Sequence, residues 1–401
     1  MNTIVTILKK RSIHLTVLRV LILALLLIQL GIYWKDYSRP FRKDFMYNLY
    51  YHSQWVMPEH IQSIGDDGLY QVAGDQLLQK HNFFEVNPEV PPLGKYYYGY
   101  SIRFLGSAER GALLLFLSTA LLFYFLVRIF VKDHILQAFA VLFFVTDPLL
   151  FYQSRVSMLD LPQLTALLAH VFFMIKILNA KFSAKKSYLL LLALSGITLG
   201  SFVSIKIGAL GIVVILADVI ILLKKKSIVS IFPILFLAWL TYISTYAMYF
   251  VQGHNIIEWL KAQKWMLHFY SSSLIQPVYG TVFTTLLTGK IIGWDVGATW
   301  AHVSEWTISW TVFFVSTVII LASRVKKMLF SDNETLYLSM LIAGLLAGYT
   351  ILPFFTRYLV LVIPLLLIFV FHQLSVRKKM HNVVYLSLIA LFAVHYYMFW
   401  Y

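Results

Sequence analysis

Residues 111–127 read Gly-Ala-Leu-Leu-Leu-Phe-Leu-Ser-Thr-Ala-Leu-Leu-Phe-Tyr-Phe-Leu-Val, an uncharged run that lies between Arg110 and Arg128. A helix needs about 20 such residues to cross the hydrocarbon core of a bilayer. Similar runs recur along the chain, at about 14–33, 111–131, 135–152, 161–179, 187–204, 207–223, 227–251, 308–323, 335–352, 356–374 and 382–400. We therefore predict an all-α polytopic membrane protein with about eleven transmembrane helices.

The composition of the whole chain agrees with this fold class. Of the 401 residues, 60% are hydrophobic and 13% are charged, whereas soluble domains are about 45–50% apolar and about 25% charged. An ordinary soluble enzyme and a disordered chain are therefore excluded. The runs are much longer than the strands of a membrane barrel, so a helical bundle is expected. The chain has no cysteine, which excludes disulfides, thiolate metal sites and a cysteine nucleophile.

The basic residues predict the orientation of the chain. Lys9, Lys10 and Arg11 precede the first apolar run, which lacks a small-residue cleavage site and is interpreted as a retained signal anchor. With a cytoplasmic N-terminus, every basic cluster falls on the inner side, as the positive-inside rule requires. These clusters are Lys9–Arg11, Arg128 with Lys132, Lys181 with Lys185 and Lys186, Lys224–Lys226, Arg324 with Lys326 and Lys327, and Arg377–Lys379.

The net charge of +15 is then explained by topology, and a nucleic-acid partner is not expected. We predict a multi-pass integral membrane protein, in a prokaryotic cell membrane rather than the endoplasmic reticulum. Two long polar segments, 34–110 and 252–307, fall on the outer face. Long loops are often functional. No repeat or linker divides the chain, so residues 1–401 are predicted to form a single membrane domain.

Two carboxylates, Asp66 and Asp67, lie side by side in the first outer loop between Gly65 and Gly68. Neighbouring negative charges repel each other, which favours proton uptake by one of them and suits a general base. The alternative is a solvated turn, since Asp and Gly are ordinary turn residues.

Further charged residues lie close to the outer membrane boundary. Glu89 is surrounded by prolines, and Lys95 opens an aromatic stretch that is typical of a membrane interface, where it would contact lipid headgroups or a substrate's lipid phosphate. Arg155 and Asp160 lie among apolar residues, where charges often mark functional sites. For Asp160, the alternative role is to cap the following helix.

Two cations lie at positions where the predicted spans leave only a short connecting segment. Lys206 lies between two predicted spans, and Arg357 lies at the start of another. Each must reach the outer surface or meet an anion. Arginine and lysine both bind phosphate, so we expect these two cations and Arg155 to hold a lipid phosphate, while the carboxylates activate a nucleophile. The loop histidines lack metal-ligand spacing, and neither a metal nor a cofactor is expected.

The order of these motifs resembles that of the protein O-mannosyltransferase family, membrane glycosyltransferases of the GT-C fold. Asp66-Asp67 resembles the family's Asp-Glu pair, and Phe83-Phe-Glu-Val-Asn-Pro-Glu-Val-Pro-Pro-Leu-Gly-Lys95 resembles "FFDVHPPLGK". Residues 155–162 are similar to "RxxxLDxP", 200–208 to a segment that supplies a lysine, and 263–270 faintly to "QxxMxxYH". The sequence departs from the family in Asp67, which replaces glutamate, and in a two-residue insertion where the family has histidine.

The resemblance implies transfer of a sugar, with mannose expected, from a polyprenyl- or dolichyl-phosphate donor to a hydroxyl of a protein or glycan acceptor on the extracytoplasmic face. It implies that Asp66 is the base and that Asp67 is the second catalytic carboxylate, which would orient the acceptor or the base. Glu89 and Asp160 would orient the acceptor or the base, and Lys206, Arg357 and Arg155 would bind the donor phosphate. The remaining partners would be membrane lipids. The alternatives are a transporter or flippase of lipid-linked sugars and a non-catalytic membrane subunit.

Overall fold

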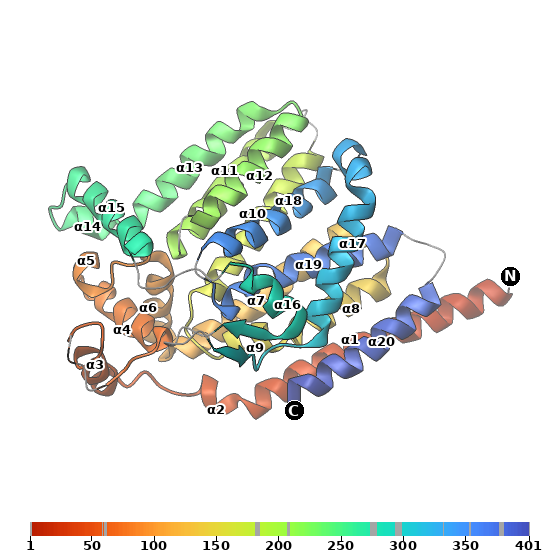
Figure 1. Ribbon diagram of the computed structural model, residues 1–401, viewed down its shortest axis with the longest axis horizontal. Helices are drawn as coiled ribbons and strands as arrows, with labels where there is room; N and C mark the ends of the chain where they lie inside the picture. The colour runs from red at the N-terminus through yellow and green to blue at the C-terminus, as the bar shows by residue number, and fades with distance from the viewer. Residues whose placement is uncertain are drawn as a thin grey trace. The chain divides into compact units, whose positions relative to one another are not determined.

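A computed structural model describes residues 2–57, 59, 62–180, 185–206, 209–272, 279–292, 299–331, 333–352, 354–376 and 381–400. They form the helices α1 to α20, two 3-10 helices and one two-stranded sheet (Figure 1). Of the basic clusters that predict the orientation, Lys181 and Arg377–Lys379 lie outside the described residues, and so does Gly208 of the 200–208 motif.

The chain divides into two compact units. The first unit comprises residues 1–34, 118–152 and 278–401, and the second comprises residues 35–117 and 153–277. Helix α7 (Ala108–Phe130) begins in the second unit and ends in the first. The prediction that residues 1–401 form one membrane domain stays a prediction.

The first unit is made mainly of helices. They are α1 (Asn2–Ile32), α8 (His134–Val145), α9 (Pro148–Gln153), α16 (Thr281–Thr288), α17 (Ile308–Ser331), α18 (Asn333–Ile351), η2 (Thr356–Leu361), α19 (Ile363–Val376) and α20 (His381–Trp400). Helix α19 packs against α8, α17 and α18, and all but three of its fourteen residues are buried. The antiparallel strands β1 (Lys290–Ile292) and β2 (Trp300–His302) pair with Lys290 opposite His302.

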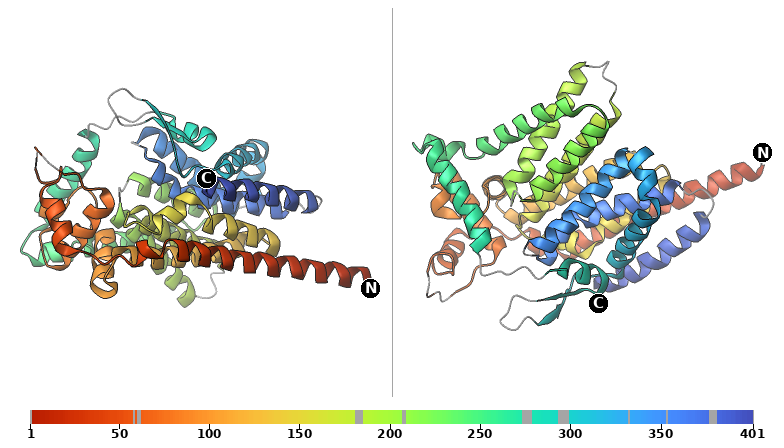
Figure 2. Two further views of the ribbon diagram at one scale, coloured as in Figure 1. Left: turned by 90° about the horizontal axis from the view of Figure 1, so that it is seen from below. Right: turned by 45° about the horizontal axis from the view of Figure 1, so that its top comes forward.

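The second unit contains the long polar segment 34–110, apart from its first residue, and the middle of the chain. Its helices are α2 (Trp34–Tyr37), α3 (Lys43–Tyr51), α4 (Asp66–Leu78), α5 (Phe83–Val86), α6 (Leu93–Leu105), α10 (Asp160–Asn179), α11 (Lys185–Ile205), α12 (Ala209–Lys224), η1 (Ile228–Ser230), α13 (Ile231–Ser244), α14 (Ala247–Val251) and α15 (Ile256–Ser272). Helix α11 packs between α10 and α13, and α4 packs on α6, as Figure 2 also shows.

The helices confirm the predicted all-α membrane fold. Seven of them in the described residues are long and apolar enough to cross a bilayer: Leu15–Ile32, Ala108–Phe130, Asp160–Asn179, Lys186–Ile205, Asn333–Ile351, Thr356–Val376 and Val383–Trp400. Three shorter apolar helices, His134–Val145, Ile228–Ser244 and Ile308–Ser323, fall on other predicted spans, and α12 falls on the remaining one.

Two predicted spans are interrupted. The run 135–152 breaks after α8, because Pro148 cannot continue a helix hydrogen-bond ladder and instead opens α9. Asp147 caps α9 by accepting the N–H groups of Leu149 and Leu150, both at 3.1 Å, and also accepts the Trp310 indole N–H at 2.7 Å. The run 227–251 breaks between α13 and α14. A continuous apolar run therefore does not guarantee one uninterrupted helix.

Glycine permits the close crossing of α4 and α6. A Cβ atom on Gly74 would overlap the Gly99 backbone and the Lys95 carbonyl, and a Cβ atom on Gly99 would overlap the Gly74 backbone. The two helices therefore touch through their backbones at Gly74 of α4 and at Lys95 and Gly99 of α6.

Candidate functional site

The first turn of α4 carries Asp66 and Asp67, and both side chains are half-buried. Carboxylates are favoured there because the N-terminal end of a helix has a partial positive charge. The Asp67 carboxylate folds back over Gly65, where Oδ1 lies 2.6 Å from the position that a Cβ atom would take. The adjacent acids thus begin a helix rather than lie in a turn, and their catalytic role stays a prediction.

Hydrogen bonds tie α4 to the segment that precedes Asp160. The Ser157 hydroxyl donates to the Asp67 carbonyl at 2.9 Å, and the Gln71 amide donates to Ser157 Oγ at 2.9 Å and to Glu109 Oε1 at 2.8 Å. The Tyr98 hydroxyl of α6 donates to the Met158 carbonyl at 2.6 Å. Segments from three parts of the sequence therefore meet at residues 157–158.

Asp160 and Lys206 form a buried ion pair. Lys206 Nζ lies 2.5 Å from Asp160 Oδ1, and the two side chains are 7% and 3% exposed. Asp160 begins α10, and Lys206 directly follows α11. The sequence predicts a site role for each residue but not their pairing. The partner that satisfies the buried ammonium is therefore supplied by the chain itself.

Gly94 brings the proline-rich motif next to this pair. A Cβ atom on Gly94 would strike Leu159 Cδ2 and would lie 3.1 Å from Ile205 Cγ2. These two residues directly precede Asp160 and Lys206 in the sequence. The first turn of α6 thus packs on the residue that precedes each member of the ion pair, and a side chain at position 94 would crowd both of these neighbours.

Lys95 faces the interior of the second unit. Its side chain is 0% exposed, and its Nζ donates to the carbonyls of Asn87 and, at 2.8 Å, of Val90. Nζ also lies 5.0 Å from the centroid of the Phe83 ring. Burial lowers the Lys95 pKa to about 7, while the charge of Glu89 acts in the opposite direction. The expected contact of Lys95 with lipid headgroups is therefore wrong, because the ammonium has no access to the surface.

Glu89 is itself 8% exposed and lies between the two residues whose carbonyls Lys95 binds. The preceding glutamate, Glu85, is exposed on α5. The two glutamates of the motif therefore occupy different environments, and only Glu89 is placed within the packed motif.

Arg155 makes a looser contact. Its Nη1 lies 3.6 Å from Asp36 Oδ2, and the two side chains are 21% and 26% exposed. Asp36 also accepts a 2.8 Å hydrogen bond from the exposed Arg39. Arg155 therefore retains access to solvent, unlike Lys206.

Arg357 belongs to the first unit, whereas the other predicted site residues belong to the second. It lies in η2, with its guanidinium carbon 4.9 Å from the Phe355 ring centroid and 5.8 Å from that of Tyr358. Its assignment to the donor phosphate stays a prediction.

Three residues of this network were not identified from the sequence: Glu109, Gln71 and Ser157. Glu109 also accepts the Ser107 hydroxyl at 2.7 Å. A carboxylate in the first turn of an apolar span is a signal that could have found Glu109, but the adjacent Arg110 favours a solvated helix end. Within the described residues, no group of three or more His, Cys, Asp or Glu side chains has the arrangement of a metal site.

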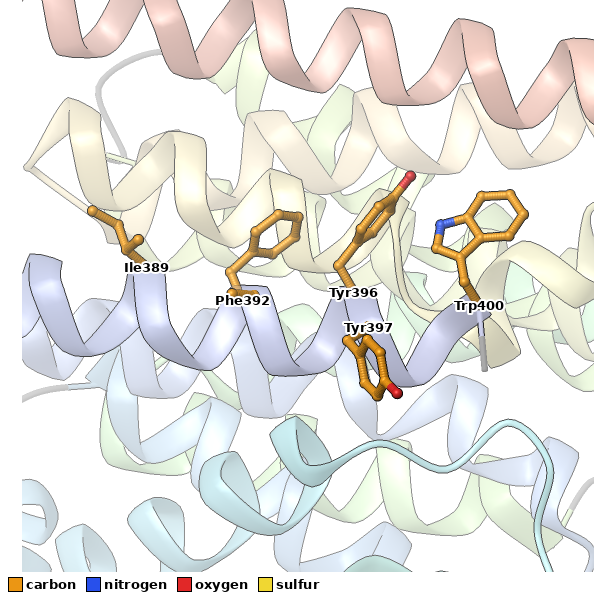
Figure 3. A pocket seen from close by; sticks show the side chains of 6 residues that line it. Ile389, Phe392, Tyr396, Tyr397 and Trp400 are labelled. Atoms are coloured by element: carbon orange, nitrogen blue, oxygen red, sulfur yellow. The ribbon is translucent and has the colours of Figure 1, made fainter.

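The first unit holds a separate apolar groove of about 800 Å³ along α20. Figure 3 shows Phe392, Tyr396 and Trp400 projecting from one side of this helix, at helical spacing. None of the predicted site residues lines the groove. We therefore assign it no part in the candidate chemistry.

Comparison with known proteins gives a likeness of fold. No family model matches the sequence, and no curated protein matches it. The structure is similar to the crystal structure of ArnT from Cupriavidus metallidurans bound to undecaprenyl phosphate, with a TM-score of 0.61, 14% identity, and coverage of 92% of this chain and 62% of that chain. It is also similar to the apo form of ArnT, with a TM-score of 0.56, 13% identity, and coverage of 82% and 57%.

The chain therefore spans less than two thirds of the length of ArnT. At this level of identity, the likeness concerns the fold. The predicted GT-C-like class is confirmed: the chain has the ArnT-like GT-C fold of an all-α polytopic membrane protein.

Proposed function

We propose that the protein is a membrane glycosyltransferase that moves a sugar from a polyprenyl-phosphate donor to an acceptor hydroxyl. The observation that carries the proposal is a set of contacts on either side of the buried Asp160–Lys206 pair in the second unit. Ser157, three residues before Asp160, binds the backbone of Asp67 in the first turn of α4, and Gly94 of the proline-rich motif packs on Leu159 and Ile205. The fold likeness to ArnT, which was crystallised with undecaprenyl phosphate, supports a lipid-phosphate donor.

The reaction that we propose is a single displacement at the anomeric carbon. Asp66 accepts the proton of the acceptor hydroxyl, and the acceptor oxygen forms a bond to the anomeric carbon. The bond between that carbon and the phosphate oxygen breaks, and its electron pair leaves with the lipid phosphate. Stabilisation of the charge that grows on the leaving phosphate lowers the barrier.

We assign stabilisation of the phosphate to Lys206, with Arg155 of the same unit as a further ligand. The donor-phosphate role of Arg357 stays a prediction from the sequence. Lys206 already has a carboxylate partner in Asp160, which fixes the direction of its ammonium. As negative charge develops on the phosphate, the ammonium can interact with both anions. Asp67 and Glu89 would orient the acceptor or the base, together with Asp160.

The expected sugar is mannose, and the acceptor would be a protein or glycan hydroxyl. Both assignments rest on the resemblance to protein O-mannosyltransferases. The active site would face the extracytoplasmic side, with the N-terminus in the cytoplasm.

A transfer assay distinguishes this function from transport. Membranes containing the protein are given radiolabelled polyprenyl-phosphate mannose, and label is followed into protein and glycan fractions and across the bilayer of sealed vesicles. Covalent transfer that depends on the protein supports the proposal. Movement of intact donor between leaflets without any transfer would instead favour the flippase alternative.

A further inference from the structure

Lys95 is a charged group that the proposed chemistry does not use. Its ammonium is directed at the chain itself, to the carbonyls of Asn87 and Val90 and to the face of the Phe83 ring. A side chain with no exposed area cannot reach a substrate without rearrangement. Its contacts therefore point to a role within the protein.

The segment that Lys95 binds has few hydrogen-bond donors of its own. Pro88, Pro91 and Pro92 have no N–H group, so half of residues 87–92 cannot donate from the backbone. Buried carbonyl groups nevertheless need donors, because an unsatisfied one costs about as much as a lost hydrogen bond. The Lys95 ammonium supplies two such donors from the first turn of α6.

Glu89 lies between the two carbonyls that Lys95 holds. One ammonium holds Val90 after Glu89 and Asn87 two residues before it, and Pro88 between them has a fixed φ. The backbone of Glu89 therefore has little freedom, and its side chain is 8% exposed. The glutamate itself contributes a negative charge that favours the charged form of Lys95.

Lys95 also belongs to the rigid contact between α4, α6 and the ion pair. Its own carbonyl lies against Gly74 of α4, and the preceding Gly94 lies against Leu159 and Ile205. The ammonium therefore connects the Glu89 segment to α6, whose first turn packs on the residues next to Asp160 and Lys206.

We propose that Lys95 is a positioning residue, whose ammonium holds the Asn87–Val90 backbone and thereby sets the place of Glu89 in the active site. The inference rests on the proposed function in so far as Glu89 acts in the transfer reaction. The backbone restraint itself can be tested without any activity.

The test compares the wild-type protein with three single variants, Lys95→Met, Lys95→Arg and Glu89→Gln. A double variant combines Lys95→Met with Glu89→Gln. Lys264→Met is the matched control, because Lys264 is an exposed lysine of α15. The first readout is hydrogen exchange of the amides in residues 85–96. We expect faster exchange in Lys95→Met there but not in α10, and no change in the control. Unchanged exchange in Lys95→Met would overturn the proposal.

The second readout is sugar transfer from polyprenyl-phosphate mannose. We expect Lys95→Met to lower kcat about 10- to 100-fold, with the donor KM within about twofold of wild type. Lys95→Arg retains two donors and should recover part of the lost kcat. If Lys95→Met is poorly folded, the same comparison is made with Lys95→Gln, which keeps an N–H donor.

The double variant separates positioning from general destabilisation. If Lys95 acts through Glu89, the double variant should be no slower than the slower single variant, because the same contribution is lost once. Multiplying effects would overturn the proposal, and so would a Lys95→Met variant with wild-type kcat. If the wild type transfers no sugar while Lys95→Met shows the local increase in exchange, the proposed function fails and the positioning role stands.

Discussion

Lys206 Nζ lies 2.5 Å from Asp160 Oδ1, and both side chains are more than nine-tenths buried. One residue begins α10 and the other follows α11, so the ion pair joins the start of one helix to the end of another that packs along it. A buried pair of this kind is tolerated because each charge compensates the other, whereas loss of one partner leaves an uncompensated charge.

The pair should therefore behave as a unit in unfolding experiments. We expect Asp160→Asn or Lys206→Met alone to lower the free energy of unfolding by about 3–5 kcal/mol. The double variant, Asp160→Asn with Lys206→Met, should lose less unfolding free energy than the two single variants lose in sum. Chemical unfolding in detergent measures all three. Strictly additive losses would show that the two groups do not interact in solution.

The two glutamates of the proline-rich motif provide a matched comparison. Glu89 is buried and Glu85 is exposed, only four positions apart. We expect Glu89→Gln to reduce sugar transfer by about tenfold or more, because an orienting group near the reacting atoms is lost. Glu85→Gln should leave transfer within about twofold of wild type. Equal effects of the two substitutions would remove Glu89 from the proposed site.

The burial of Lys95 predicts a pH dependence of stability. Its pKa falls from 10.5 to about 7 on folding because burial disfavours the charge. Between these values the unfolded state binds more protons than the folded state, so the contribution of Lys95 to the unfolding free energy should rise with pH.

This rise is measured as the difference in unfolding free energy between wild type and Lys95→Met from pH 7 to pH 9. The upper limit avoids ionisation of tyrosines, such as Tyr97, whose pKa burial raises to about 12. We expect the unfolding free energy of the wild type to rise relative to that of Lys95→Met as pH increases. A difference independent of pH would mean that Lys95 keeps its ordinary pKa.

Gly94 should tolerate no side chain. A Cβ atom there would strike Leu159 and crowd Ile205, and overpacking in a packed interior costs about 1–3 kcal/mol. Gly94→Val should therefore lower both stability and transfer. Gly31, whose Cβ position has nothing within 4 Å, is the matched control, and Gly31→Val should be nearly neutral for transfer. Full transfer by Gly94→Val would contradict the described contact between α6 and the ion pair.

Much of the fold was predictable from hydrophobic pattern alone. Apolar runs such as 356–374 coincide with helical segments because length and continuity are sufficient signals for a span. The breaks at Asp147-Pro148 and at Thr245-Tyr246 were missed. The longer runs around both breaks are apolar. The first break depends on the Asp147 cap, and at the second Tyr246 packs into a buried cluster.

The site was only partly predictable. Asp160 and Lys206 stand out as charges among apolar residues, but their pairing links positions far apart in the chain, which spacing along the sequence does not reveal. Lys95 was expected at lipid headgroups because a lysine beside tyrosines is typical of an interface. Its actual direction depends on the carbonyls of the proline-rich segment, which only the folded backbone brings together.

The central claim is that a carboxylate at the start of α4 serves as the base of a sugar transfer. The most direct measurement is transfer of radiolabelled mannose from polyprenyl-phosphate mannose by wild type, Asp66→Asn and Asp44→Asn. Asp44 is an exposed carboxylate of α3 in the same unit. Loss of a general base costs about 10²–10⁴-fold, so Asp66→Asn should lose transfer to that extent while Asp44→Asn keeps it. Equal transfer by Asp66→Asn and wild type would contradict the assignment.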